Sequence, residues 1–136
     1  MSFLLDTNVL AEVRKSRANP GVKEWFEAVE EAQLFLSVLV VGEIRQGVDR
    51  LRRRDPRQAA GYDAWLTGLR TRFARRILPV TEEVAVEWGR LNVPDPLPVV
   101  DGLLAATARV HGLTLVTRNV ADVARVDVPL FNPFRG

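Results

Sequence analysis

Several oxygen-bearing side chains of this 136-residue chain lie beside apolar segments, where one structural element is expected to give way to the next. They are Asp6, Glu43, Asp101, Asn119 and Asp122. Carboxylates that a fold brings together repel one another and raise one another's pKa unless a cation lies between them. Oxygen ligands of this kind suit Mg²⁺ or Mn²⁺. These residues therefore indicate a candidate site for a divalent cation.

Each of these residues, taken alone, also has an ordinary structural explanation. An acid directly after a strand, as at Asp6, is typical of a turn or a helix cap. An acid such as Asp101 favours the positive end of a helix dipole. Glu43 fits the solvated edge of a helix, and Asp122 fits an ordinary surface position. A metal site therefore requires that the fold brings the acids together.

Composition narrows the kinds of site that the chain can build. It has no cysteine and one histidine, which excludes a disulfide framework, a thiolate-bound metal and a site of several histidines within one chain. Apolar residues make up 47% and charged residues 26%, as in soluble globular proteins. Any metal ion must therefore be held by oxygen atoms, and residues 1–136 are expected to form a single domain.

The apolar segments are too short to cross a membrane. The longest apolar run, residues 34–42, is about half of the ~20 residues that a membrane-spanning helix needs. The N-terminus has no basic leader, and Asp6 interrupts its apolar stretch. We therefore expect a soluble, cytoplasmic protein with no membrane association.

Alternating strand and helix patterns predict an α/β fold that would place the acids at one edge of a sheet. Strands are expected at 2–5, 34–36, 77–80, 113–117 and 126–130, and helices at about 9–13, 20–29, 37–53, 55–73, from 81 onward, 101–111 and 119–124. Such alternation is typical of a mostly parallel sheet flanked by helices on both faces. In these sheets ligands bind beyond the carboxyl ends of the strands.

The residues that carry this pattern also match a family. The matching blocks are Leu4-Leu5-Asp6-Thr7-Asn8-Val9-Leu10, Glu43 with Ile44 and Gly47, Asp101 with Ala105 and Ala106, Thr117-Arg118-Asn119, and Asn132-Pro133-Phe134. In this order and spacing the chain resembles PIN domains, and in particular the VapC toxins of bacterial toxin–antitoxin pairs, including those of the FitB type. The resemblance covers the whole chain and implies a PIN-like fold.

The resemblance assigns roles to individual residues. Asp6, Glu43 and Asp101 match the three family acids that hold Mg²⁺ or Mn²⁺. The fourth family position, an Asp in many PIN domains, is occupied by Asn119, which offers a carbonyl oxygen but no charge. Asp122, one helical turn further on, is the other candidate for that position. The number of metal ions that the site binds is therefore left open.

Three neighbours of these acids match supporting positions. The hydroxyls of Thr7 and Thr117 are expected to steady the ligands or to contact phosphate. Arg118, beside the expected site, is the best single candidate for a phosphate contact. Asn132-Pro133-Phe134 resembles the family's C-terminal tail, where the Phe would anchor the chain.

The function implied by the resemblance is that of an endoribonuclease toxin whose metal-activated water hydrolyses RNA. The acids of the site suit this chemistry, because a metal ion can activate water at neutral pH and offset the charge that develops on phosphate. The expected partners are RNA, a VapB-like cognate antitoxin and a second copy of the chain. A larger assembly with the antitoxin would reach operator DNA only through that antitoxin.

Two other functions are considered. The chain could be a weakly active or inactive PIN-domain component of a DNA-binding regulatory complex, which the substitution at Asn119 leaves open. It could also be a phosphatase or phosphoacceptor with an Asp after its first strand. The second is disfavoured because Asp6-Thr7-Asn8 lacks a second Asp two residues on, and the chain has no late Lys.

Two features in the middle of the chain, an arginine-rich segment and a tryptophan, each have two interpretations. Ten Arg and three acids lie between Arg45 and Arg76, which fits either phosphate contact or solvated helix faces. Trp65 fits either the core or the groove that receives an antitoxin helix in the family. Trp25 and Trp88 are expected to pack in the core.

Overall fold

The computed structural model describes residues 1–135, and a five-stranded parallel sheet lies at their centre. The strands are β1 (Phe3–Leu5), β2 (Leu34–Ser37), β3 (Ile77–Leu78), β4 (Thr114–Val116) and β5 (Leu130–Phe131). They are arranged in the order β3-β2-β1-β4-β5, and every pairing is parallel. The predicted α/β class is confirmed. Because β1 is flanked by β2 and β4, the residues that follow these three strands come together at one edge.

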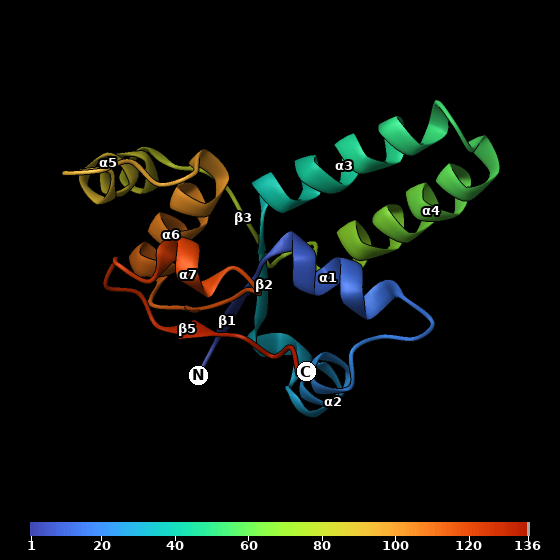
Figure 1. Cartoon of the computed structure of the whole chain (residues 1–136), viewed down its shortest axis with the longest axis horizontal. Coiled ribbons are helices and arrows are strands. Elements are labelled where there is room, and N and C mark those ends of the chain that lie inside the picture. The colour runs from blue at the N-terminus through green and yellow to red at the C-terminus, as the bar shows by residue number, and fades with distance from the viewer. Residues whose placement is uncertain (136) are drawn as a thin grey trace.

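Helices cover both sides of this sheet (Figure 1). They are α1 (Thr7–Arg14), α2 (Pro20–Ala28), α3 (Val38–Arg52), α4 (Pro56–Arg72), α5 (Glu82–Leu91), α6 (Val99–His111) and α7 (Val120–Val123), with a 3₁₀ turn at Glu31–Gln33. The helices α5, α6 and α7 lie on one side of the strands, and α1, α3 and α4 lie on the other. The α3–α4 pair forms a long hairpin that projects away from the sheet.

Local side-chain hydrogen bonds begin most of the longer helices where the sequence predicts them. The side chain of Ser37 accepts the backbone N–H of Leu39 at the start of α3, and Asp55 accepts that of Gln58 at the start of α4. Thr81 caps α5 in the same way. These caps satisfy donors that a helix end leaves free. The cap at Ser37 also fixes the direction in which α3 leaves the sheet.

The core fills the space on both faces of the sheet. Leu4 and Leu5 of β1 are consecutive, so they point to opposite faces, and both are fully buried. This is the burial expected of a central parallel strand. Phe73, just after α4, is the largest fully buried side chain.

The predicted boundaries of the last strand, of β3 and of α6 are wrong. The last strand is Leu130–Phe131 rather than 126–130, because residues 124–128 form turns in which Val128 is buried without belonging to a strand. β3 ends at Leu78 instead of residue 80, just before a proline that has no N–H to donate to the sheet. α6 begins at Val99, so Asp101 lies in its first turn rather than at its start.

The tryptophans differ from one another in their packing. Trp25 packs against the core as predicted and contacts Phe3 edge to face at a ring distance of 5.2 Å. Trp88 lies outside the main core cluster, against Gly102, and its buried indole N–H has no hydrogen-bond partner within the described residues. The prediction of a core position for Trp88 is therefore wrong.

No helix within residues 1–135 is long and apolar enough to cross a membrane.

The C-terminal segment is held against the start of α2. The Oδ1 atom of Asn19 accepts the backbone N–H groups of Gly21, Val22 and Arg135, and its Nδ2 donates to the Arg135 carbonyl at 2.6 Å. Phe134 is half-buried and packs against the core, which confirms its predicted anchoring role.

Gly21 lies where this segment crosses α2, and a methyl group there would collide with the carbonyl oxygen of Pro133. We expect Gly21→Ala to lower the free energy of unfolding by roughly 1–3 kcal/mol, because neither backbone can move away cheaply. Urea denaturation measures this. Gly61→Ala is the control, since its added methyl meets nothing within 4 Å. It should be neutral or stabilising by up to about 1 kcal/mol. Equal stability of the two variants would contradict the close contact.

Candidate active site

The carboxylate of Asp6 is buried at the junction of β1, α1 and β4. It is 6% exposed, and its Oδ1 accepts the backbone N–H of Thr7 at 2.7 Å, which caps α1. Its Oδ2 accepts the hydroxyl of Thr117, directly after β4, at 2.7 Å, and the side-chain amide of Asn8 at 3.3 Å. Burial raises the pKa of Asp6, and the hydrogen bonds from Thr117, Thr7 and Asn8 oppose that rise.

A second hydrogen bond brings Glu43 to this junction. The hydroxyl of Thr7 donates to Oε1 of Glu43 at 2.6 Å, which joins α1 to the second turn of α3. Glu43 is partly buried, and its carboxylate is held against Thr7, the residue directly after Asp6. The alternative in which Glu43 lies free on a solvated helix edge is wrong.

Asp101 enters the same region from α6. Its pKa is raised to about 6, first by burial and then by the negative charges of Asp6, Asp122 and Glu43. The structure thus places Asp6, Asp122 and Glu43, which come from different parts of the chain, close enough to Asp101 for their charges to raise its pKa. Asp122 is exposed on the short helix α7 and contributes through its charge.

The segment after β4 supports the junction through its backbone as well as its side chains. The hydroxyl of Thr117 accepts the backbone N–H of Asn119 at 3.0 Å, and Thr117 is only 1% exposed. Asn119 itself is exposed. Thr7 and Thr117 both contact carboxylates, which is the supporting position expected of them.

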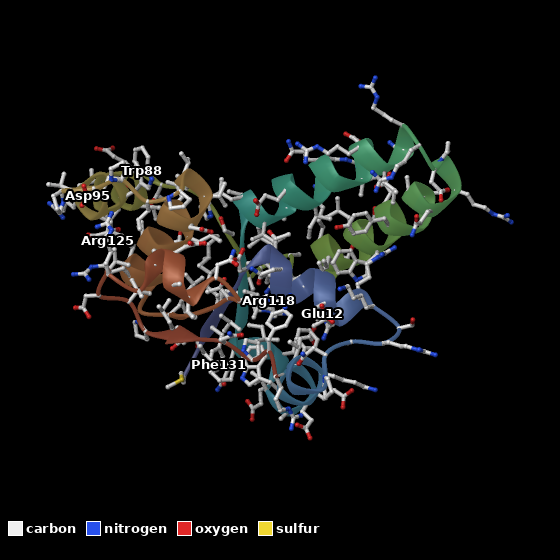
Figure 2. The ribbon with its side chains drawn as sticks, viewed as in Figure 1. Glu12, Trp88, Asp95, Arg118, Arg125 and Phe131 are labelled. Atoms are coloured by element: carbon white, nitrogen blue, oxygen red, sulfur yellow. The ribbon has the colours of Figure 1, made fainter. Side chains whose placement is uncertain are left out.

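Arg118 lies beside the site but reaches toward the C-terminal tail. Its guanidinium lies 4.7 Å from the ring centroid of Phe134. The pKa of Glu12 is lowered mainly by a hydrogen bond from Lys15, and the Arg118 charge adds a smaller effect. Figure 2 shows Arg118 and Glu12 as neighbours near α1. A phosphate contact by Arg118 therefore stays a prediction.

Asn8 is a part of the site that sequence reasoning missed. Its Nδ2 donates to Asp6, and its Oδ1 accepts the backbone N–H of Arg118 at 3.2 Å. The amide thus joins the turn after β1 to the turn after β4. The only signal in the sequence is its position two residues after a capping acid.

The carboxylate oxygens of the site are the kind of ligand that a hard divalent cation prefers. In the described residues, however, these side chains do not surround one point. Within residues 1–135, no three carboxylates converge closely enough to enclose an ion. The acids nevertheless raise the pKa of Asp101, and a bound cation would relieve that repulsion. Asp6 and Glu43 are already fixed by threonine hydroxyls. Asp6, Glu43 and Asp101 are therefore the residues that would hold Mg²⁺ or Mn²⁺.

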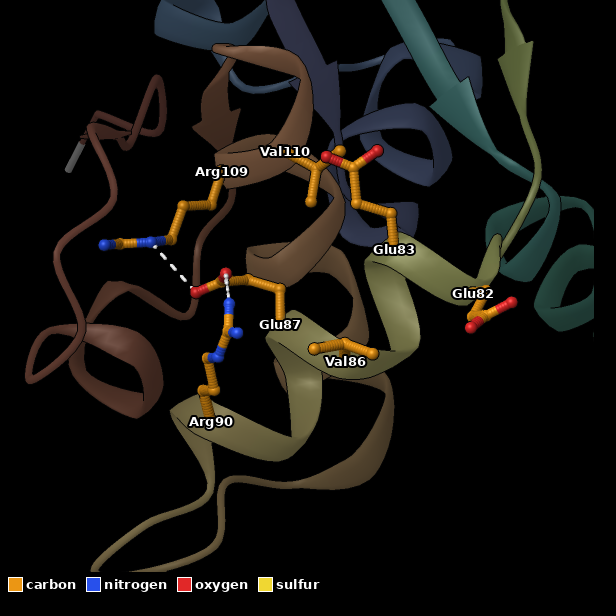
Figure 3. Close-up of a pocket in the computed structure, with 7 residues that line it drawn as sticks. All are labelled: Glu82, Glu83, Val86, Glu87, Arg90, Arg109 and Val110. Atoms are coloured by element: carbon orange, nitrogen blue, oxygen red, sulfur yellow. Dashed lines mark ion pairs between the residues drawn. The ribbon is translucent and has the colours of Figure 1, made fainter.

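A different depression lies between α5 and α6 (Figure 3). Glu87 in its floor pairs with Arg109 at 3.1 Å and with Arg90 at 3.7 Å. These charges satisfy one another, and none of the candidate site residues lines the depression.

Comparison with known proteins identifies the family. The PIN domain family model matches residues 3–128. The chain belongs to the PIN domain family. Toxin FitB of Neisseria gonorrhoeae is 32% identical over 97% of this chain and 98% of the relative. VapC ribonuclease Y4jK of Sinorhizobium fredii is 28% identical over 97% of each chain.

Solved structures of related proteins share the fold of this PIN domain. FitAB bound to an IR36 DNA fragment includes a chain that is 30% identical, with a TM-score of 0.89 over 98% of this chain and 96% of that chain. A toxin–antitoxin complex from Klebsiella pneumoniae includes one that is 26% identical, with a TM-score of 0.70 over 98% of both chains. The predicted PIN-like fold and the resemblance to VapC toxins of the FitB type are confirmed.

The raised pKa of Asp101 predicts how stability depends on pH. The metal-free folded protein holds the Asp101 proton more tightly than the unfolded chain, so its free energy of unfolding falls as the pH rises from 3.8 to about 6. Asp101→Asn should therefore raise the melting temperature at about pH 7.5 by a few degrees. This corresponds to on the order of 1 kcal/mol, because solvent screens the partly exposed group. The gain should shrink at about pH 4, where the folded-state carboxyl is already protonated.

Thermal melts in a chelating buffer at both pH values measure this difference. Asp95→Asn in the exposed loop before α6 is the matched control and should change neither melt. An Asp101→Asn variant that is no more stable than this control at about pH 7.5 would contradict the repulsion among the acids.

Proposed function

We propose that this PIN domain, residues 1–136 acting as one unit, is a metal-dependent endoribonuclease and the toxin of a toxin–antitoxin pair. The observation that carries the proposal is the arrangement of acids at the carboxyl edge of the sheet, where Asp6 and Glu43 are held by threonine hydroxyls and Asp101 is close enough to feel their charges. The relatives named as ribonuclease and toxin support it.

Asp6 and Asp101 are the proposed principal ligands of Mg²⁺ or Mn²⁺, and Glu43 binds the ion directly, through water, or orients the attacking water. Asn119 or Asp122 completes the set. A bound ion would supply an activated water and a positive charge that offsets the charge developing on the phosphate. Thr117 and Asn8 orient the Asp6 carboxylate by donating hydrogen bonds to it, and these hydrogen bonds favour its ionised form. The hydroxyl of Thr7 orients the Glu43 carboxylate by donating a hydrogen bond to it.

The proposed binding site for the antitoxin is the apolar groove between α1, α2 and α4. Leu10, Val13, Phe26, Trp65 and Leu69 line it. Trp65 is half-buried and stacks on Tyr62 at a ring distance of 5.6 Å, so it packs against the core and still presents an edge to the groove. An amphipathic antitoxin helix would bury that edge. We further propose a homodimer that reaches operator DNA only through the antitoxin, as a component of a larger assembly.

One observation favours the second candidate function, a weakly active component of a regulatory complex. Asn119 brings no negative charge to the site, and three carboxylates do not converge on one point within the described chain. A site with these two properties would bind its cation weakly. The protein would then act by binding the other members of the complex rather than by cleaving RNA.

Mapping RNA ends after expressing the chain alone in cells separates the two functions. The proposal predicts discrete new cuts with 5′-phosphate and 3′-hydroxyl ends, because the attacking group is water. Asp101→Asn should abolish these cuts, and Asp95→Asn should retain them. Ends with 2′,3′-cyclic phosphate would mean that the RNA's own 2′-hydroxyl attacks and would refute the water mechanism. No cuts from a folded protein would favour the regulatory component.

A further inference from the structure

We propose that the turn between α3 and α4 is a second RNA-contact surface, where four arginines bind phosphates at a distance from the bond that is cut. We define these four residues, Arg50, Arg53, Arg54 and Arg57, as the arginine tip. The inference rests on the proposed function in one respect, because it takes RNA as the ligand. It adds where the RNA lies on the protein and how much of it is bound.

The hairpin carries the arginine tip away from the acids. α3 begins where β2 ends and holds Glu43 in its second turn. Ten residues separate Glu43 from Arg53, which corresponds to roughly 15 Å along the helix at 1.5 Å per residue. The turn lies at the far end of the projecting hairpin in Figure 1. Figure 2 shows nitrogen-tipped side chains extending outward around this end.

Charge is balanced along the hairpin but not at its end. Arg45 pairs with Asp49 at 3.0 Å and with Asp63 at 3.1 Å, and Arg52 pairs with the same two acids at 3.2 and 3.0 Å. Asp55, the only acid among residues 50–57, accepts the backbone N–H of Gln58 as a helix cap. Across residues 1–135, no ion pair involves an arginine of the tip.

Helix stability does not explain this concentration of charge. Arg50 in the last turn of α3 is favoured by the negative end of that helix. Arg57, however, lies in the first turn of α4, where the helix dipole disfavours a cation. All four side chains belong to exposed residues and repel one another. An anionic ligand would turn this repulsion into attraction.

RNA supplies the charge that the arginine tip lacks. The acids of the candidate site repel a phosphate backbone except where a cation offsets them, so binding energy for RNA must come from elsewhere on the protein. Guanidinium groups bind phosphate oxygens through paired N–H donors. The span of roughly 15 Å corresponds to about four to five nucleotides of a stacked strand that rises 3.4 Å per nucleotide along its axis. An RNA longer than this reaches both surfaces at once.

The test compares two variants that lose the same charge. The tip variant carries Arg50→Gln, Arg53→Gln, Arg54→Gln and Arg57→Gln. The control variant carries Arg17→Gln, Lys23→Gln, Arg70→Gln and Arg75→Gln, all at exposed positions. The probe is a labelled RNA stem-loop of about twenty nucleotides, which spans both surfaces. Binding is measured in a chelating buffer so that the RNA stays intact.

We expect the tip variant to bind the stem-loop at least about tenfold more weakly than the control variant at ~0.1 M salt. The slope of log affinity against log salt should be smaller by roughly two to four. Equal losses in the two variants would overturn the proposal, because net charge alone would then explain them. Stem-loop binding that the tip variant retains, with loss of poly-glutamate binding instead, would overturn it in favour of an acidic protein partner.

The outcome is separable from that of the proposed function. If the unaltered protein cuts no RNA but its stem-loop binding depends on the arginine tip, the RNA-contact surface stands and the ribonuclease proposal fails. If the protein cuts RNA with the expected ends while the tip and control variants bind the stem-loop equally, the ribonuclease stands and the second surface is refuted. Where both hold, the tip variant should raise KM for long RNA and leave kcat unchanged.

Discussion

The buried carboxylate of Asp6 is the constraint on which the rest of the site depends. One of its oxygens begins α1 by accepting the Thr7 N–H, and the other accepts the hydroxyl of Thr117 from the end of β4. A charge that is 6% exposed is stable only with such donors. The same hydrogen bonds fix the relative positions of β1, α1 and the turn after β4. Through the hydroxyl of Thr7, they also determine where Glu43 of α3 lies. The hydrogen bonds that hold these elements together are therefore the same ones that orient the carboxylates of the candidate site.

Repulsion among the acids gives the site its chemical character. Burial and then the negative charges of Asp6, Asp122 and Glu43 raise the pKa of Asp101 to about 6. The folded chain thus stores unfavourable charge at one edge of the sheet, which a divalent cation would relieve. The same chain concentrates unpaired positive charge at the far end of the α3–α4 hairpin. The two charge clusters together are suited to a polyanion that is held at one place and cut at another.

Features governed by nearby residues could be predicted from the sequence, whereas features governed by distant contacts could not. Ser37 and Asp55 cap helices that the sequence predicts to begin at these residues, because capping depends on residues only two or three positions away. The acids were assigned to one edge because parallel strands place their carboxyl ends together. The short β5 could not be predicted, since Val128 is apolar to fill the core from a turn and not from a strand. The bridging role of Asn8 depends on Thr117 and Arg118, more than 100 residues away in the chain.

The central claim is that the acids bind a divalent cation, and anomalous diffraction from crystals of the protein grown with Mn²⁺ tests it most directly. Cation binding at this site predicts an anomalous peak about 2 Å from carboxylate oxygens of both Asp6 and Asp101, with Glu43 turned toward it. The peak should be lost in Asp101→Asn crystals grown with the same Mn²⁺. A density map without a peak among these acids, or with Mn²⁺ bound only at another place on the protein, would refute cation binding by these residues.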